Sequence, residues 1–331
     1  MKKLRSILIA VVAVLAIIFY LFPEMLPGDV GTTETPGVTE PVGPTEEPGP
    51  TEEPGTTEDP GTTEEPGSTE NVGQLTVHYI DVGQADSILL ECQGQTMLID
   101  GGNVGDSSLV VSYLDSQGIS YLDYVICTHA HEDHVGGLSG PLSTGTAGAV
   151  YAPVTKYDSD AFRNFLKYTH EQGLEVTLPQ IDDSFLLGEA LVTVLGPRRN
   201  YTDTNDTSIV LRVDHGENSF LFTGDMEIAA EADLLADGCD LDVDVLKVGH
   251  HGSYTSTGYV FLREVMPEYA VISCGTGNSH GHPHDEVTSR LYDAGVTVYR
   301  TDQQGTIVVT SDGTELYFTT EKNVPPTEGR E

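Results

Sequence analysis

A short run of histidines and carboxylates is the part of this chain with the clearest capacity for chemistry. His129, His131, Asp133 and His134 form the pattern His-x-His-x-Asp-His within six residues. Imidazole nitrogens and carboxylate oxygens bind Zn²⁺, Mn²⁺ or Fe at about 2.0–2.2 Å. Because four ligand-type side chains occur in this order, the pattern indicates a metal site rather than a polar loop with chance histidines.

The segments in front of the ligand-type residues explain how they could meet. Residues 121–127 are mostly apolar and predict a buried strand that ends just before His129. Asp225, His250 and His251 likewise follow apolar, strand-like runs. Since strand ends converge at one edge of a sheet, we expect residues far apart in the chain to lie together there.

Helical patterns alternate with these strand-like runs. In the first of them, Leu109, Val110, Tyr113 and Leu114 recur at helical spacing. The predicted helices cover residues 106–117, 159–172, 226–236, 257–264 and 285–294. This order of strands and helices favours an α/β domain with two central sheets flanked by helices.

Several further segments, taken with the first pattern, resemble the metallo-β-lactamase fold superfamily. They are Asp81-Val82-Gly83-Gln84-Ala85-Asp86-Ser87, Leu98-Ile99-Asp100-Gly101-Gly102, Phe222-Thr223-Gly224-Asp225, Leu246-Lys247-Val248-Gly249-His250-His251-Gly252-Ser253, His282-Pro283 and Arg300-Thr301-Asp302-Gln303-Gln304-Gly305-Thr306-Ile307. The series is similar to the branch represented by the hydrolase domain of the ComEC competence proteins. The resemblance extends over about residues 74–320.

The resemblance implies a four-layer αββα sandwich with two divalent metal ions, Zn²⁺ or Mn²⁺, at one edge between the sheets. The implied ligands are His129 and His131 for the first ion, Asp133 and His134 with one of His250 and His251 for the second, and Asp225 bridging both. Of the adjacent histidines, His250 is slightly preferred as the ligand. The other would support the site or face the substrate.

The chain departs from many superfamily members, which carry another histidine between the first cluster and the bridging aspartate. That interval here contains His170, in a predicted helix, and His215, at a predicted hairpin, and neither has the expected context. Asn205 and Ser208 match the Asn-x-x-Ser of the competence branch instead. The first site is therefore expected to be more open and weaker, which makes Mn²⁺ an alternative to zinc.

Other residues are candidates for supporting or catalytic roles. Asp81 and Asp100 could each fix a ligand imidazole, although each could equally be a structural turn residue. His282 is expected near the site. Two metal ions about 3.5–4 Å apart can lower the pKa of a shared water, so that hydroxide forms near neutral pH.

Catalytic roles follow from this chemistry. Asp133 would orient the attacking hydroxide as well as bind metal. The leaving group would be protonated by His282, or by whichever of His250 and His251 is not a ligand.

The chain divides into four predicted parts. Residues 1–28 begin with positive charges and continue with sixteen uncharged residues, at 7–22, which predict a membrane anchor with the rest of the chain outside. A cleaved signal peptide is the alternative. Residues 29–73 repeat Thr-Glu-Glu-Pro-Gly and predict a disordered spacer. The hydrolase domain is expected at 74–320 and a C-terminal tail at 321–331.

The charge of the chain restricts its partners. The net charge is −37, and residues 6–155 contain no lysine or arginine. Twelve of the 52 acidic residues lie in the spacer, so most of the excess belongs to the folded part. This acidity argues against a broad nucleic-acid-binding face, which requires a basic stripe.

The expected function is an extracytoplasmic, membrane-tethered phosphodiesterase or nuclease. The resemblance suggests DNA as one substrate, because degradation of one DNA strand is the role proposed for the related competence domain. One alternative is a cell-surface esterase for small phosphodiesters of the phosphorylcholine type. Another is a non-catalytic metal-binding surface protein. The sequence indicates no protein partner.

Overall fold

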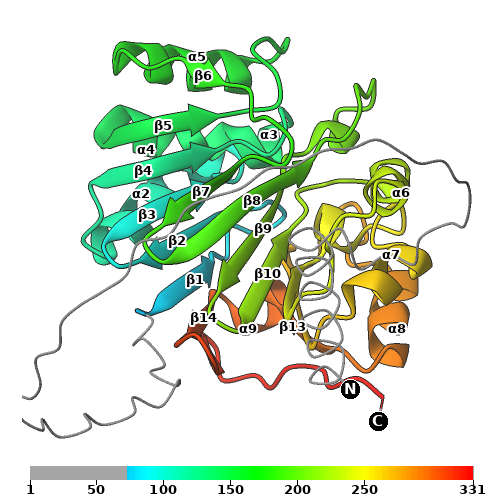
Figure 1. The fold of residues 1–331 in the computed structure, drawn as a ribbon. Coiled ribbons are helices and arrows are strands. Elements are labelled where there is room, and N and C mark those ends of the chain that lie inside the picture. The colour runs from blue at the N-terminus through cyan, green and yellow to red at the C-terminus, as the bar shows by residue number, and fades with distance from the viewer. Residues whose placement is uncertain (1–72, 331) are drawn as a thin grey trace, which may run out of the picture. The chain divides into compact units, whose positions relative to one another are not determined.

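The computed structural model describes residues 73–330, which form two β-sheets with helices on both outer faces (Figure 1). The predicted anchor at 1–28, and the spacer at 29–73 except Gly73, lie outside the described residues. Between residues 73 and 330, no helix combines the length and the hydropathy needed to cross a bilayer.

The first sheet contains eight strands in the order β15-β14-β1-β2-β3-β4-β5-β6. Their bounds are β1 Leu75–Tyr79, β2 Ile88–Cys92, β3 Gln95–Ile99, β4 Tyr121–Ile126, β5 Thr146–Tyr151, β6 Val176–Thr177, β14 Ile307–Ser311 and β15 Leu316–Thr320. The pairs from β3 to β6 are parallel, so β3 and β4 both end at the same edge of the sheet.

The second sheet contains seven strands in the order β13-β12-β11-β10-β9-β8-β7. Their bounds are β7 Ser184–Leu187, β8 Ala190–Gly196, β9 Val210–His215, β10 Asn218–Phe222, β11 Val245–Lys247, β12 Tyr269–Ile272 and β13 Thr297–Arg300. The strands β10 to β13 are parallel. Val298 of β13 also pairs with Thr327, so part of the segment predicted as a tail lies along this sheet edge.

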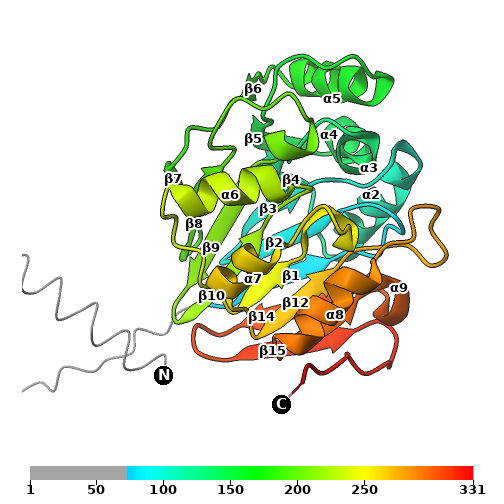
Figure 2. The ribbon, with the colours of Figure 1, turned by 90° about the vertical axis from the view of Figure 1, so that its right-hand side faces the viewer.

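Helices cover the outer faces of both sheets, and Figure 2 shows α6, α7 and α8, which cover the second sheet, from the front. Their bounds are α2 Ser107–Ser116, α3 Glu132–Val135, α4 Ser139–Thr144, α5 Asp160–Glu171, α6 Ile228–Ala236, α7 Tyr259–Val265, α8 Asp285–Asp293 and α9 Thr301–Gln304. Buried residues of α2, α4 and α5 pack on the first sheet, and those of α6, α7 and α8 on the second. The predicted four-layer arrangement is therefore present.

A third apolar cluster fills the space between the sheets. It includes Val77 and Tyr79 of β1 and Phe220 and Phe222 of β10, all buried. Alternate residues of these strands therefore face the partner sheet, while their neighbours face the helices, as the period of two in a strand requires. Burial on both faces holds the strand ends, and thus the loops that follow them, in fixed positions.

The five predicted helices are present as α2, α5, α6, α7 and α8, with ends that differ by at most two residues. The sequence pattern does not predict β5 or β7. β5 consists of Thr-Ala-Gly-Ala-Val-Tyr, whose small side chains carry a weak apolar signal, and it is held by parallel pairing with β4. Tertiary pairing overrides weak local preference at such positions.

Candidate metal centre

The loop that leaves β4 carries the complete His-x-His-x-Asp-His pattern. His129 and His131 lie in the loop itself, whereas Asp133 and His134 lie in the short helix α3. The segment after α3 packs directly on the loop after β3, since a Cβ on Gly137 would lie 1.7 Å from the carbonyl oxygen of a neighbouring glycine there. Only glycine permits this close approach, which fixes the ligand loop against the first sheet.

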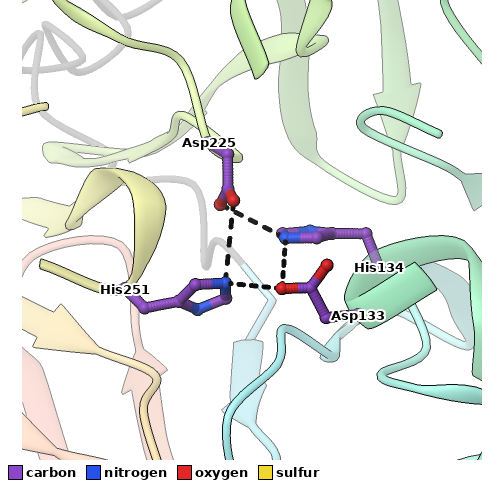
Figure 3. Close-up of side chains that lie close together, drawn as sticks. All are labelled: Asp133, His134, Asp225 and His251. Atoms are coloured by element: carbon purple, nitrogen blue, oxygen red, sulfur yellow. Dashed lines mark hydrogen bonds and ion pairs between the residues drawn. The ribbon is translucent and has the colours of Figure 1, made fainter. Parts of the chain in front are cut away.

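Four side chains from three separate motifs converge at this edge of the sheets (Figure 3). Asp225 Oδ1 lies 3.2 Å from His134 Nε2, and Asp133 Oδ2 lies 3.3 Å from His251 Nε2. Asp225 Oδ2 is 3.7 Å from His251 Nε2. The four ligand atoms all lie within 4.8 Å of one another.

The polar atoms of this group fit a divalent cation. His134 Nε2 and Asp225 Oδ1 are buried and have no hydrogen-bond partner, although they face each other. Buried polar atoms are nearly always paired, so two unmatched polar atoms at one point indicate a site that fits a cation. The side chain of Asp133 is 32% exposed, which leaves one side of the group open to solvent.

A second, smaller group adjoins the first and shares Asp225. His129 Nε2 lies 3.0 Å from His131 Nδ1 and 3.9 Å from Asp225 Oδ2. Asp225 therefore stands between the two histidine sets, where a bridging carboxylate is expected. The two histidines between the first cluster and Asp225 in the chain do not belong to the centre. His170 contacts Glu175, and His215 contacts Ser311.

The electrostatics of the centre favours positive charge. Burial alone would lower the pKa of His134, but the carboxylates of Asp225, Asp100 and Asp133 raise that pKa well above its ordinary value. His251 behaves in the same way: burial opposes the shift, yet neighbouring carboxylates led by Asp225 raise its pKa to about 10. Binding of a metal ion would therefore release protons from these rings.

Asp100 binds the ligand loop through Thr128 and His134. Its Oδ2 accepts hydrogen bonds from Thr128 Oγ1 at 2.6 Å and from His134 Nδ1 at 2.7 Å, and its Oδ1 accepts from the Thr128 backbone at 2.7 Å. A carboxylate on Nδ1 fixes the His134 ring and leaves Nε2 for a metal. Asp100 thus lies where a supporting carboxylate was predicted.

Of the two roles that the sequence left open for Asp81, the structure favours the structural turn residue, because its side chain contacts Gly83 and Lys322 and not a histidine of the site. Its Oδ1 accepts from the backbone of Gly83 at 3.2 Å, and its Oδ2 lies 3.6 Å from Lys322 Nζ. The short side chain closes its own turn. Asp86, in the same motif, reaches the site instead, with Oδ1 3.3 Å from His251 Nδ1.

Three residues of the site were not predicted: Asp86, Lys247 and Glu227. Lys247 is fully buried in β11, and a buried lysine requires a partner. The lysine within an otherwise apolar strand is the sequence signal that could have identified it. Glu227 follows Asp225 by two residues, and nothing in its context distinguishes it from a surface glutamate.

The adjacent histidines have different surroundings. His251 is 1% exposed and belongs to the four-residue group, whereas the side chain of His250 is 22% exposed. His250 Nδ1 lies 3.2 Å from Glu227 Oε1, and its Nε2 lies 3.7 Å from Asp225 Oδ2. The geometry therefore favours His251 as the ligand and leaves His250 at the open side, against the slight preference from the sequence.

Asn205 and Ser208 both act on residues of the centre. Ser208 Oγ accepts from the Asp225 backbone at 3.1 Å and lies 3.5 Å from His129 Nδ1. Asn205 Nδ2 donates to Glu227 Oε1 at 3.2 Å, and this carboxylate in turn contacts His250. The two residues thus support the bridging aspartate and the exposed histidine respectively.

His282 lies beside the centre, as predicted. Its ring centroid is 5.5 Å from that of His250 and 6.3 Å from that of His251. Gln84 Nε2 donates to His282 Nδ1 at 3.2 Å, while Gln84 Oε1 accepts from the Gly275 backbone. Burial, together with the nearby histidines, lowers the pKa of His282 to about 4. A neutral ring with Nδ1 as acceptor carries its proton on Nε2.

The chain resembles known proteins over most of the described residues. Residues 80–276 match the family model described as the metallo-beta-lactamase superfamily. ComE operon protein 3 of Bacillus subtilis (strain 168) is 31% identical over 250 residues, covering 70% of this chain and 32% of that protein. Competence protein ComA of Neisseria gonorrhoeae is 33% identical, covering 69% and 31%. This chain therefore spans about a third of the length of these relatives.

A solved structure supports the fold. The metallo-beta-lactamase fold protein YhfI from Bacillus subtilis superimposes with a TM-score of 0.50 at 16% sequence identity. The match covers 72% of this chain and 100% of YhfI. At this identity the likeness concerns the fold alone.

Proposed function

The chain belongs to the metallo-beta-lactamase superfamily, and from this we propose that it is a metal-dependent phosphodiesterase. The observation that carries the proposal is the pair of ligand groups that share Asp225. His129 and His131 would hold one ion, and Asp133, His134 and His251 the other. Zn²⁺ or Mn²⁺ at these ligands would supply Lewis acidity and a water of lowered pKa.

The residues around the ligands suit an anionic, tetrahedral substrate centre. Asp133 is the exposed carboxylate of the group and can accept a hydrogen bond from the attacking water. His282, neutral and protonated on Nε2, can donate a hydrogen bond to a phosphoryl oxygen, but it is too weak a base to carry a proton at neutral pH. Of the two proton donors that the sequence left open, this favours the histidine that is not a ligand over His282.

His250 is the better candidate for proton transfer to the leaving group. Glu227 Oε1 lies 3.2 Å from His250 Nδ1, and Thr255 Oγ1 donates to the same carboxylate oxygen at 2.9 Å. This contact fixes Nδ1 of a ring that is 22% exposed, and it leaves Nε2 3.7 Å from Asp225 Oδ2. A carboxylate behind an imidazole is a common arrangement for general acid–base work.

The cellular setting belongs to the same proposal. We place the enzyme on the outer face of the membrane, held by residues 1–28 and separated from the bilayer by the spacer at 29–73. The similarity to proteins named for competence favours DNA as a substrate. The net charge of −37 instead favours a small phosphodiester, which lacks the extended repulsion of a polyanion.

A three-substrate assay tests the proposal. The purified protein, loaded with Mn²⁺ or Zn²⁺, is assayed on bis-p-nitrophenyl phosphate, p-nitrophenyl phosphorylcholine and fluorescent single-stranded DNA. We expect turnover that His131→Ala and Asp225→Ala each reduce by at least about a hundredfold while circular dichroism stays unchanged. Cleavage of DNA supports the nuclease, and cleavage of only the small diesters supports the cell-surface esterase.

Two outcomes would contradict the proposal. Unchanged turnover in both variants would reject this site. Absence of turnover on all three substrates, with metal bound, would favour the non-catalytic metal-binding protein.

A further inference from the structure

An ion pair is buried directly beneath the proposed second metal site. Lys247 and Asp86 are 0% and 1% exposed, and Lys247 Nζ lies 2.8 Å from Asp86 Oδ2. Lys247 Nζ also donates to the Val248 carbonyl at 2.9 Å. Burial of two charges is costly, so a pair retained at such a position requires a reason other than packing.

The second carboxylate oxygen of Asp86, Oδ1, faces His251, a proposed metal ligand. Asp86 Oδ1 lies 3.3 Å from His251 Nδ1, which also donates to the Ser273 carbonyl at 3.0 Å. The hydrogen bond to the Ser273 carbonyl requires a proton on Nδ1, which the Asp86 carboxylate faces as an ion-pair partner, so His251 Nε2 is left to face Asp133 and Asp225. The Asp86 backbone N–H also donates to the Asp133 carbonyl at 3.2 Å. Asp86 thus touches the segments of two proposed ligands.

We propose that Asp86 and Lys247 are positioning residues that control the second metal ion. The Asp86 carboxylate restrains the ring of His251 by its charge beside Nδ1, and Lys247 holds Asp86 in place. Lys247 also neutralises Asp86, so the carboxylates left to balance the bound ions would be those of Asp100, Asp133, Asp225 and, beside His250, Glu227. A centre without the additional negative charge of Asp86 would repel a phosphodiester anion less; this last step rests on the proposed function.

The decisive variant removes both charges together. The double substitution Asp86→Asn with Lys247→Met leaves no unpaired buried charge, so the protein is expected to fold. Isothermal titration of the metal-free, full-length chain with Mn²⁺ or Zn²⁺ should then show one ion bound as in the wild type. The affinity for the second ion should fall by about 10–100-fold, the range found when support of a ligand is lost.

A remote ion pair provides the matched control. Arg212 and Asp214 pair at 2.8 Å on β9, where Arg212 also contacts the Asp240 and Asp242 carbonyls. Arg212→Met with Asp214→Asn removes a more exposed ion pair remote from the site, and both ions should bind with wild-type affinity. Wild-type affinity for the second ion in the Asp86 and Lys247 double variant would overturn the proposal.

A second variant covers the case in which the double variant fails to fold. Asp86→Glu keeps the charge balance with Lys247 but lengthens the side chain by one methylene, which displaces the acceptor from His251 Nδ1. The same selective loss of the second ion is expected, and unchanged binding would overturn the proposal. The titration contains no substrate, so a failure of the phosphodiesterase assay does not affect its outcome.

Discussion

Two neighbouring histidines illustrate how surroundings decide a role at the scale of single residues. His250 and His251 both have positive φ, 51° and 53°, within the short 3-10 segment Gly249–Gly252 after β11. Left-handed backbone is unusual for residues other than glycine and concentrates at functional sites. In this segment the left-handed backbone directs the two rings to different partners. His251 is buried against Asp133, and His250 contacts Glu227.

Substitution of each histidine by alanine should separate binding from catalysis. His251→Ala should lose the second metal ion, with an affinity at least about tenfold lower, because it removes a ligand. His250→Ala should keep both ions but lower kcat by about 10²–10⁴-fold, because it removes a proton donor. Metal titration and steady-state kinetics on both variants provide the measurement.

His170→Ala is the control for this comparison. His170 is exposed on α5, and its ring contacts Glu175. Its substitution should change neither the affinity for the second metal ion nor kcat. Loss of the second ion from His250→Ala, with retention in His251→Ala, would reverse the assignment.

At the scale of helices, strands and loops, close backbone contacts fix the position of the ligand-bearing loops. The segment 136–138 after α3 packs on the loop after β3, with Gly137 facing the carbonyl of Gly101. On the second sheet, the buried carboxylate of Glu231 in α6 accepts from the backbone of Thr257 and of Gly258, which follow the His250 loop. Each contact connects a ligand-bearing loop to a packed element.

Alanine in place of Gly137 should destabilise the domain and with it the metal centre. The added Cβ would lie 1.7 Å from the Gly101 carbonyl oxygen, so the backbone must move. We expect the free energy of unfolding to fall by about 3 kcal/mol or more, at the upper end for overpacking. Gly105→Ala, where a Cβ meets no atom within 4 Å, should change it by less than about 1 kcal/mol. Urea denaturation of both variants measures the difference.

The contribution of Glu231 to the free energy of unfolding should depend on pH. Burial raises the pKa of Glu231 from 4.5 to about 7, so the folded protein binds a proton there that the unfolded chain has lost. The contribution of this group is therefore fully present below about pH 4.5 and is lost as the pH rises to about 7. A shift of this size corresponds to roughly 3 kcal/mol.

Glu231→Gln should remove this dependence. Between about pH 4.5 and pH 7.5, the free energy of unfolding of the wild type should fall relative to that of the variant by roughly 3 kcal/mol. Urea denaturation in the presence of a chelator measures it, because the metal ligands then titrate identically in both proteins. Parallel profiles would show that Glu231 stays ionised when folded.

Charge is the dominant property at the scale of the whole molecule. The chain carries 52 acidic and 15 basic residues, and the basic side chains near the surface are largely paired, as in Arg198 and Arg199 with Asp237. Such a surface repels an approaching polyanion over about a Debye length, about 10 Å at 0.1 M salt. Attraction of an anion is expected at the metal centre once ions are bound.

The salt dependence of DNA cleavage should therefore be opposite to that of a basic nuclease. Raising NaCl from about 20 to 200 mM should increase kcat/KM for single-stranded DNA by roughly 3–10-fold, because screening removes repulsion. Cleavage of bis-p-nitrophenyl phosphate, a single charge, should change by less than about twofold. A fall in DNA cleavage with salt would reveal a local basic path that the net charge conceals.

Local patterns in the sequence were sufficient for much of this molecule. Ligand-type residues at strand ends predicted the metal centre, since convergence of strand ends is a general property of sheets. Apolar periodicity predicted α2, α5, α6, α7 and α8, because one buried face requires that spacing. The family resemblance, rather than periodicity, supplied the four layers and the bridging role of Asp225.

Only the tertiary structure distinguished residues with similar local contexts. Asp81 and Asp86 share one motif in the loop between β1 and β2, yet Asp81 closes its own turn and Asp86 reaches His251. The same holds for Lys247, whose partner is 161 positions away in the chain. Sequence spacing specifies which side chains are present near a strand end, but long-range packing decides which of them touch.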